Sequence, residues 1–377
     1  MKLAPCTHQP PCPGCPRYGD SRIDDDLLAI LQTLAARSGA TLDRAVIGAD
    51  LGFRVRARLA VRGRAASPKL GIFQEGTHQI ADIPNCTIQH PRINAAARAI
   101  RAAIRKTGFS PYADRPHVGL LRYVQIVVER TTGRVQVVLV VNDTSSDSVS
   151  ATAGELIALL GDKLQSLWWN GNTERANSIF GPSWELLAGE QAVEETIGGA
   201  QVWFPPGAFG QSNLDLADAL ITDLHSRVPD DAVVTELYCG VGAIGLGLLG
   251  RSREVRFNEV SPHGLHGLQM GLAVLPIELR EKALVTPGDA AEAIDDLYGA
   301  SVAIVDPPRK GLDLVVMAAL REHHPEQILY VSCDVESLER DAELLTRRGH
   351  YRLARLTPYA LFPYTDHVET LAEFQAA

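Results

Sequence analysis

The pattern of apolar and polar positions changes near residue 200 of this 377-residue chain. Before that point, apolar residues often alternate with polar ones. In residues 54–62 arginine recurs at most second positions, which predicts a strand with a row of arginines along one face. Residues 124–128 and 135–141 are expected to be paired strands. Two stretches with helical spacing, residues 21–38 and 93–106, accompany them. We therefore expect a mixed, β-rich domain in the first part of the chain.

Beyond residue 200, short apolar runs alternate with glycine turns and helical segments. The runs expected to be buried strands are residues 233–237, 255–259, 302–305 and 327–331. This alternation predicts a parallel sheet with helices on both faces, hence an α/β fold. In such folds, ligands bind beyond the carboxyl ends of the strands.

A glycine motif follows the first of these strands. Gly240-x-Gly242-x-x-Gly245 is expected to open a helix, and Glu259 lies at the end of the next strand, 19 residues after Gly240. Such glycines let the backbone approach a ligand, and the acid can bind ribose hydroxyls. The pattern alone is compatible with a nicotinamide dinucleotide, with S-adenosylmethionine, or with a turn used only for packing. The preceding Glu236-x-Tyr238 favours the methyl donor, because it resembles the first motif of class I methyltransferases.

Motifs at two further strand ends indicate a reaction at a carbon atom of a nucleobase. Asp306-Pro307-Pro308 is similar to a motif of amine methyltransferases in which an aromatic residue follows, but here Arg309 takes that place. Cys333 ends another strand, where a nucleophile and a buried structural cysteine are both reasonable readings. A thiolate that adds to C6 of uracil makes C5 nucleophilic, and a base must later remove the C5 proton. Glu369 is the candidate base, with a solvated surface carboxylate as the alternative. His367 is expected to have a structural or orienting role.

Charge is distributed unevenly along the chain. The net charge is −9, yet residues 51–140 contain 15 lysines and arginines against 4 acidic residues, a local charge of +11. This region predicts a polyanion such as RNA as partner, although a solvated basic face is the simpler alternative. No apolar run reaches the roughly 18 residues of a membrane span, and the amino terminus resembles no secretory signal, so we expect a cytoplasmic protein. Candidate phosphate contacts are Arg54, Arg56, Arg58, Arg62, Arg64, Lys69, Arg122 and Arg134.

Four cysteines form a candidate metal site. Cys6, Cys12 and Cys15 are clustered near the amino terminus, and Cys86 lies far along the chain. In a reducing compartment such a cluster indicates metal binding rather than disulfides. Four thiolates suit either zinc or a cubane iron–sulfur cluster, and the spacing does not choose between them.

Taken together, several motifs resemble the RNA uracil-C5 methyltransferase family over nearly the whole chain. These motifs are Glu236-Leu237-Tyr238-Cys239-Gly240-Val241-Gly242, Asp306-Pro307-Pro308-Arg309-Lys310-Gly311, Val331-Ser332-Cys333 and Phe362-Pro363-Tyr364-Thr365-x-His367-x-Glu369. The resemblance implies a class I S-adenosylmethionine-dependent (Rossmann-like) methyltransferase domain over residues 196–377. It also implies a smaller β-rich iron–sulfur and RNA-binding domain over residues 1–17 and 49–195. The helix at residues 20–38 is expected to pack on the methyltransferase domain.

The same resemblance assigns roles to individual residues. Cys333 would be the nucleophile and Glu369 the base. The implied cofactor contacts are Gln211, Tyr238, Glu259 and Asp306, with Asp289 a weaker candidate. The four cysteines would hold a [4Fe-4S] cluster. Because the chain begins directly at the cysteines, it is most similar to the short members that modify 23S ribosomal RNA.

One departure and several alternatives stay open. The family usually reads Ser-Cys-Asn-Pro, whereas this chain has Asp334 after Cys333, and a carboxylate there disfavours a thiolate unless it points away or is paired. The alternatives are a transfer RNA substrate, a non-catalytic RNA-binding homologue and a nicotinamide-dependent oxidoreductase, which would leave Cys333 and Glu369 unexplained. The sequence gives no signal on oligomeric state, and a monomer is the default.

Overall fold

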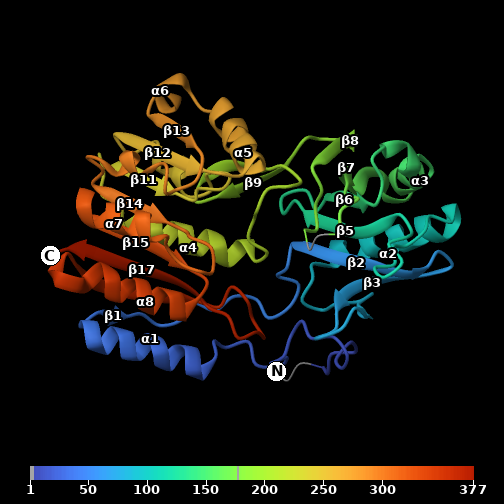
Figure 1. The fold of residues 1–377 in the computed structure, drawn as a ribbon, viewed down its shortest axis with the longest axis horizontal. Helices are drawn as coiled ribbons and strands as arrows, with labels where there is room; N and C mark the ends of the chain where they lie inside the picture. The colour runs from blue at the N-terminus through green and yellow to red at the C-terminus, as the bar shows by residue number, and fades with distance from the viewer. Residues whose placement is uncertain (1–3, 176–177) are drawn as a thin grey trace. The chain divides into compact units, whose positions relative to one another are not determined.

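The computed structural model describes residues 4–175 and 178–377, which form two compact units (Figure 1). The first unit contains the chain up to Gly19, Ala49–Glu195 and Pro205–Ser212. The second contains Asp20–Gly48, Thr196–Phe204 and Asn213–Ala377. The first three residues of the predicted iron–sulfur domain lie outside the described part of the chain.

The first unit is built on one sheet, in the order β4-β3-β2-β5-β6-β7-β8. Its strands are β2 (Arg56–Arg64), β3 (Ser67–Phe73), β4 (Ile80–Asp82), β5 (Leu121–Val128), β6 (Val135–Val141), β7 (Leu164–Gly171) and β8 (Ser183–Gly189). Helix α2 (Pro91–Thr107) packs on β3, β5 and β6, and α3 (Ser150–Leu160) packs on α2 and β7. Because side chains alternate along a strand, Leu59 and Val61 of β2 are buried on the helix-covered face, while Arg58 and Ala60 project from the other.

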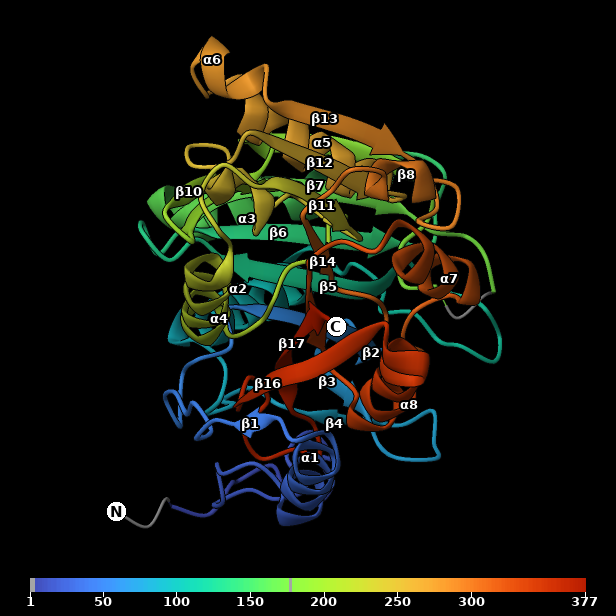
Figure 2. The ribbon, with the colours of Figure 1, turned by 90° about the vertical axis from the view of Figure 1, so that its left-hand side faces the viewer.

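The second unit contains a sheet in the order β1-β16-β17-β15-β14-β11-β12-β13 (Figure 2). Its strands are β1 (Thr41–Leu42), β11 (Val233–Leu237), β12 (Glu254–Glu259), β13 (Ala283–Pro287), β14 (Val302–Val305), β15 (Gln327–Ser332), β16 (Tyr351–Tyr359) and β17 (Glu369–Ala376). Strands β11 to β15 run parallel to one another, and β17 runs antiparallel between β15 and β16. A hairpin of β9 (Val193–Ile197) and β10 (Ala200–Phe204) precedes this part of the chain.

Helices cover this sheet, and their apolar side chains pack against it to form the core of the unit. They are α1 (Asp25–Ser38), α4 (Leu214–Arg227), α5 (Pro262–Ala273), α6 (Ile277–Arg280), α7 (Leu314–His323) and α8 (Val335–Thr346). One apolar cluster joins Leu31 and Leu34 of α1 with Leu320 of α7, Leu338 of α8 and Val305 of β14. Burial of such side chains is the main stabilising contribution to the unit.

Local signals explain most element boundaries. The strands predicted at 233–237 and 302–305 are confirmed with the same bounds, because short apolar runs flanked by polar or glycine residues leave little freedom. Helix α1 begins at Asp25 rather than near residue 21. The Asp24 side chain accepts the backbone N–H of Asp26 at 2.9 Å and caps the helix, and Gly39 ends it at a φ of 65°.

The prediction that a helix begins at the glycine motif is wrong. After β11 the chain forms turns and a short 3-10 segment, η3 (Gly245–Leu248). Glycine is a poor helix former, and this stretch repeats it. A Cβ at Gly245 would collide with the side chains of Glu236 and Phe257, so the backbone must pass close to the sheet. In the described part of the chain, no helix is long and apolar enough to cross a membrane.

Candidate active site

The predicted catalytic and cofactor residues of the second unit gather at one edge of its sheet. Parallel strands share the edge at which they end, so Glu259 of β12, Asp306 after β14 and Cys333 after β15 meet there. Strand β17 is antiparallel, and its first residue therefore lies at this same edge. The pairing of Ser332 with Thr370 places Glu369 beside Cys333.

The surroundings of Cys333 disfavour ionisation of its thiol. Cys333 is half-buried, and burial raises its pKa to about 11, with further contributions from the negative charges of Glu369 and Asp306. The positive charge of Arg309 acts in the opposite direction. Since the thiolate is the nucleophile, added positive charge near Cys333 would activate it.

Glu369 is an unpaired carboxyl group in the interior. It is 1% exposed, and within the described residues neither of its carboxyl oxygens has a hydrogen-bond partner. Burial raises the pKa of Glu369 well above its ordinary value, and the charge of Asp306 adds to this effect. Burial likewise raises the pKa of Asp306 to about 7. Unsatisfied buried carboxyl groups are costly, and they are concentrated at functional sites.

Arg309 and His367 connect two loops at this edge. The Arg309 guanidinium Nη2 lies 3.0 Å from Nε2 of His367. Burial, followed by the charge of Arg309, lowers the pKa of His367, so its neutral ring can accept the arginine N–H. The contact joins the loop after β14 to the loop before β17, and the structural or orienting role expected for His367 stays a prediction.

The glycine loop is held in place by two acids. Glu259 accepts the backbone N–H of Gly240 at 2.8 Å with one oxygen and that of Ser261 at 2.6 Å with the other. Glu236 accepts the backbone N–H of Gly245 at 2.9 Å, and burial raises the pKa of Glu236 to about 8. Gly240 has a φ of 59°, and a Cβ placed on it would meet no atom within 4 Å. The backbone at Gly240 is therefore uncovered, and a ligand can contact it directly.

The remaining predicted cofactor contacts are placed differently. Tyr238 is half-buried against the apolar core, in a left-handed conformation with a φ of 63°, and burial raises its pKa to about 12. Such backbone strain in a non-glycine residue is typical of functional sites. Asp289 is exposed, and its side chain accepts the backbone N–H of Ala291 at 2.9 Å. Gln211 lies in the Pro205–Ser212 segment of the first unit, and its role as a cofactor contact stays a prediction.

Asp334 is paired in the structure. It is the N-cap of α8, and its Oδ1 accepts the backbone N–H of Ser337 at 2.8 Å. The charges that shift the pKa of Cys333 most are those of Glu369, Asp306 and Arg309. Asparagine and aspartate are equally good N-caps, so the departure from the family pattern preserves the local structure next to the thiol.

Sequence reasoning missed one positioning residue, Asp341. It is 1% exposed, and its Oδ2 accepts the backbone N–H of Leu312 and the hydroxyl of Tyr330, both at 2.8 Å. Gly311 passes so close to this carboxylate that a Cβ would collide with it. Asp341 thus fixes the end of the loop that carries Arg309. The only sequence signal was an acid at a helical position where the neighbours are apolar.

The four cysteines predicted to hold a cluster lie in the first unit as free, half-buried thiols; they are Cys6, Cys12, Cys15 and Cys86. Burial raises the pKa of Cys15 to about 12, and the charges of Cys86, Cys12 and Cys6 contribute in that order. The thiols are therefore close enough to influence one another. Among the described residues, however, no group of three or more potential ligands is arranged to hold a metal ion.

Three of the arginines expected to contact phosphate are structural. Arg56, Arg62 and Arg122 are 8%, 8% and 4% exposed. The Arg62 guanidinium makes two 2.8 Å hydrogen bonds with Asp114, and that of Arg122 donates to the side-chain and backbone oxygens of Asn172. The expectation that Arg56 and Arg62 contact phosphate is wrong, because both side chains are buried and hydrogen-bond within the unit.

The sheet order of the second unit and the ligand-facing edge define a class I methyltransferase fold. A sequence profile of the tRNA (uracil-5-)-methyltransferase family matches residues 291–374. An uncharacterised RNA methyltransferase of Protochlamydia amoebophila is 36% identical over 334 residues, covering 87% of each chain. Another from Halalkalibacterium halodurans is 28% identical and covers 98% of this chain and 82% of its own.

A solved structure shares the fold of nearly the whole chain. It is the tRNA (uracil-54, C5)-methyltransferase of Pyrococcus abyssi in complex with S-adenosyl-L-homocysteine, with a TM-score of 0.76 and 23% identity. The match covers 96% of this chain and 84% of the other. The chain belongs to the family of RNA uracil-C5 methyltransferases, enzymes that use S-adenosylmethionine.

Proposed function

We propose that this protein forms 5-methyluridine in RNA through a covalent bond between Cys333 and C6 of the target uridine. The observation that carries the proposal is Glu369, a buried carboxyl group with no hydrogen-bond partner among the described residues, next to a thiol at the ligand edge of the sheet. A nucleophile and a base side by side are what C5 methylation requires.

Each residue has a defined part in the reaction. The Cys333 thiolate adds to C6, and the electron pair of the C5–C6 bond moves toward the C4 carbonyl oxygen. After C5 has taken the methyl group, the Glu369 carboxylate removes the C5 proton, the double bond re-forms and the thiolate leaves. Arg309 holds positive charge close to both groups. The methyl donor, when bound, supplies an electrophilic methyl group and a sulfonium charge that favours ionised Cys333 and Glu369.

The glycine loop suits the methyl donor. Open backbone at Gly240, with the Glu259 carboxylate beneath it, is the arrangement that accepts a nucleoside at the end of two strands. Asp306 lies at the end of the next strand, and Tyr238 and Gln211 are the further contacts that we propose. If the cofactor were a nicotinamide dinucleotide, Cys333 and Glu369 would have no role in the reaction.

The decisive test separates the two catalytic roles. The enzyme is incubated with methyl-labelled S-adenosylmethionine and RNA lacking 5-methyluridine. Cys333→Ala should transfer no label. Glu369→Gln should lower the rate by about 10²–10⁴-fold and should accumulate a denaturation-resistant protein–RNA adduct, because the C5 proton stays in place. Unchanged S-adenosylhomocysteine binding would show that both variants are folded. Full activity of Cys333→Ala would refute the mechanism, and inactive wild type on every RNA would favour a non-catalytic homologue.

For the substrate, we propose 23S ribosomal RNA, as the resemblance of the amino-terminal cysteine motif to cluster-bearing members of the family suggests. Transfer RNA is the second candidate, because the matching profile and the P. abyssi structure are named for it. Purified wild-type enzyme should label one of these two RNAs, each isolated without its natural modification. Mass-spectrometric mapping would then identify the nucleotide. With RNA as substrate, we expect the enzyme in the cytoplasm.

We further propose that Cys6, Cys12, Cys15 and Cys86 hold a [4Fe-4S] cluster. Their free thiols and mutual electrostatic influence support this set of ligands. Protein purified without oxygen should contain about four irons and four sulfides per chain. Cys86→Ser should lose most of the iron, and an equimolar zinc content instead would refute the cluster.

A further inference from the structure

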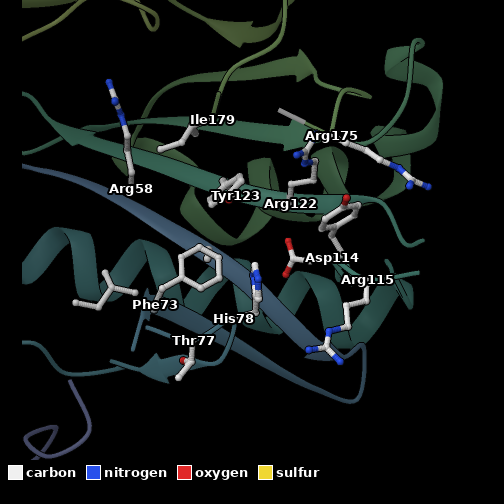
Figure 3. Close-up of a pocket in the computed structure, with 14 residues that line it drawn as sticks. Arg58, Phe73, Thr77, His78, Asp114, Arg115, Arg122, Tyr123, Arg175 and Ile179 are labelled. Atoms are coloured by element: carbon white, nitrogen blue, oxygen red, sulfur yellow. The ribbon is translucent and has the colours of Figure 1, made fainter. Parts of the chain in front are cut away.

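A basic and aromatic cavity lies on the helix-free face of the sheet in the first unit (Figure 3). Its volume is about 720 Å³, and a neighbouring hollow of about 480 Å³ shares part of its wall. The shared residues are His78, Tyr112, Asp114 and Arg115. The two hollows together form a groove, which we call the sheet groove. No role in methyl transfer has been assigned to it.

The floor of the sheet groove is shaped for a flat ring. Ala60 of β2 and Gly71 of β3 pair with each other and leave room above the sheet. Phe73 and Tyr123 flank this space, and Figure 3 shows their rings facing the same opening as His78. Gly71 cannot carry a side chain, because a Cβ would collide with the backbone of Ala81. Strand packing therefore requires a glycine here, and no side chain of residue 71 can project into the groove.

A buried cation fixes the two rings. The Arg62 guanidinium carbon lies 5.2 Å from the ring centre of Phe73 and 5.4 Å from that of Tyr123. Arg62 is held in turn by Asp114 and by the backbone oxygens of Val61 and Arg122. Because the rings are anchored before any ligand arrives, a stacking partner would lose little free energy in ordering them.

Positive charge surrounds the opening. Arg115 and Arg175 are exposed at the rim, and Lys69 lies along the neighbouring hollow. The acid of the groove, Asp114, is already paired with Arg62. The groove thus combines an aromatic platform with a cationic rim, which is the chemistry that recognises an unpaired nucleotide: a base to stack and phosphates to neutralise.

We propose that the sheet groove binds an unpaired nucleotide of the RNA substrate, separate from the uridine that is methylated. The base stacks against Phe73 and Tyr123, and the adjoining phosphates contact Arg115 and Arg175. Paired bases cannot enter, so the site selects a single-stranded segment. The proposal rests on RNA being the substrate, but it concerns a different unit from the catalytic residues.

Binding of a fluorescent twelve-nucleotide uridylate to the full-length protein tests the site. Phe73→Leu and Tyr123→Leu keep apolar volume but remove stacking, and each should raise the dissociation constant about 10-fold. Arg115→Glu should weaken binding and reduce its salt dependence. Arg105→Ala, on the exposed side of α2, is the matched control and should change the constant by less than about 2-fold. Unchanged binding by the Phe73 and Arg115 variants would overturn the proposal.

Two further readouts keep the outcome clear. Uridylate containing 5-iodouridine should crosslink on irradiation to the peptides that carry Phe73 or Tyr123, and crosslinks confined to other peptides would refute the site. Arg115 is exposed, so its variant decides the matter even if Phe73→Leu fails to fold. If the wild type binds through the groove but methylates no RNA, the proposed function fails and the site stands. If methylation proceeds with an unaltered KM for RNA in the Arg115 and Phe73 variants, the site fails alone.

Discussion

Two buried ionisable groups, one in each unit, show how differently the protein treats charge. Arg62 in the first unit is 8% exposed, and every guanidinium nitrogen donates a hydrogen bond, to Asp114 or to backbone oxygens. Glu369 in the second unit is 1% exposed, and within the described residues its oxygens accept none. The first group is satisfied by the fold itself. The second has no hydrogen-bond partner among the described residues, which agrees with the catalytic role that we propose for it.

This difference gives a criterion for deciding whether a buried ionisable group serves the fold or a function. Burying a charged group is tolerable when hydrogen bonds replace water, and such groups serve the fold. Where the replacement is missing, the fold accepts a cost, and a functional reason is expected. By this criterion Arg62 supports the architecture of the first unit, whereas Glu369 and its neighbour Cys333 are the residues for which we propose a part in the chemistry.

The largest expected effect is on the satisfied group. Arg62→Ala should lower the free energy of unfolding by about 3–5 kcal/mol, because it leaves Asp114 without its partner and removes two donors to backbone oxygens. Urea titration followed by circular dichroism measures this value. Arg64→Ala, exposed on the same strand, should change it by less than about 0.5 kcal/mol. Equal midpoints for the two variants would break the comparison.

The unsatisfied group should behave in the opposite way. The pKa of Glu369 is raised in the folded state, so the folded protein holds this proton more tightly than the unfolded chain does. The contribution of Glu369 to the free energy of unfolding is therefore most favourable below the ordinary glutamate pKa and is lost as the pH rises toward the folded-state pKa. Glu369→Gln should therefore be more stable than wild type by about 1–3 kcal/mol at pH 8, with the gain shrinking toward pH 4. Thermal unfolding across this range tests the sign. The exposed Glu281→Gln is the control, and a destabilised Glu369→Gln at pH 8 would contradict the interpretation.

A smaller effect is expected on the reactivity of the thiol. With a pKa of about 11, Cys333 should be alkylated by iodoacetamide about 10-fold faster for each unit of pH between 7 and 9. Asp306→Asn removes a negative charge that raises this pKa, and the rate at pH 8 should increase by about 2- to 10-fold. Peptide mass spectrometry follows the modification. Asp295→Asn, exposed in the same unit, should leave the rate unchanged; a slower Asp306→Asn would show that the electrostatics are misread.

The smallest effect concerns the cap next to the nucleophile. Asp334→Ala should cost about 1 kcal/mol, because α8 loses its side-chain cap, whereas Asp334→Asn should be nearly neutral. Unfolding measurements on both variants distinguish capping from an electrostatic effect on Cys333. If Asp334→Asn accelerated thiol alkylation as much as Asp306→Asn did, the carboxylate would be acting on the thiol after all.

The candidate site was accessible from the sequence to an unusual degree because its residues follow strands. Apolar runs such as residues 233–237 and 302–305 have few alternatives to a buried strand, and the motifs after them must then share one edge. Glu369 could be proposed as the base from its motif. Its missing hydrogen bonds and its raised pKa could not, since both depend on what surrounds it.

What the sequence determined by itself is the α/β class of the second unit, the strands at residues 233–237 and 302–305, and the ligand edge at which the strands end, because local periodicity and turn residues act over a few positions. What only the tertiary structure decided is which charged groups are paired. Arg62 meets Asp114 across 52 positions of sequence and Arg122 meets Asn172 across 50, so alternation along β2 and β5 could not reveal that these arginines are buried and hydrogen-bonded within the unit. Burial is a property of the chain segments that cover a residue, and those segments come from elsewhere in the fold.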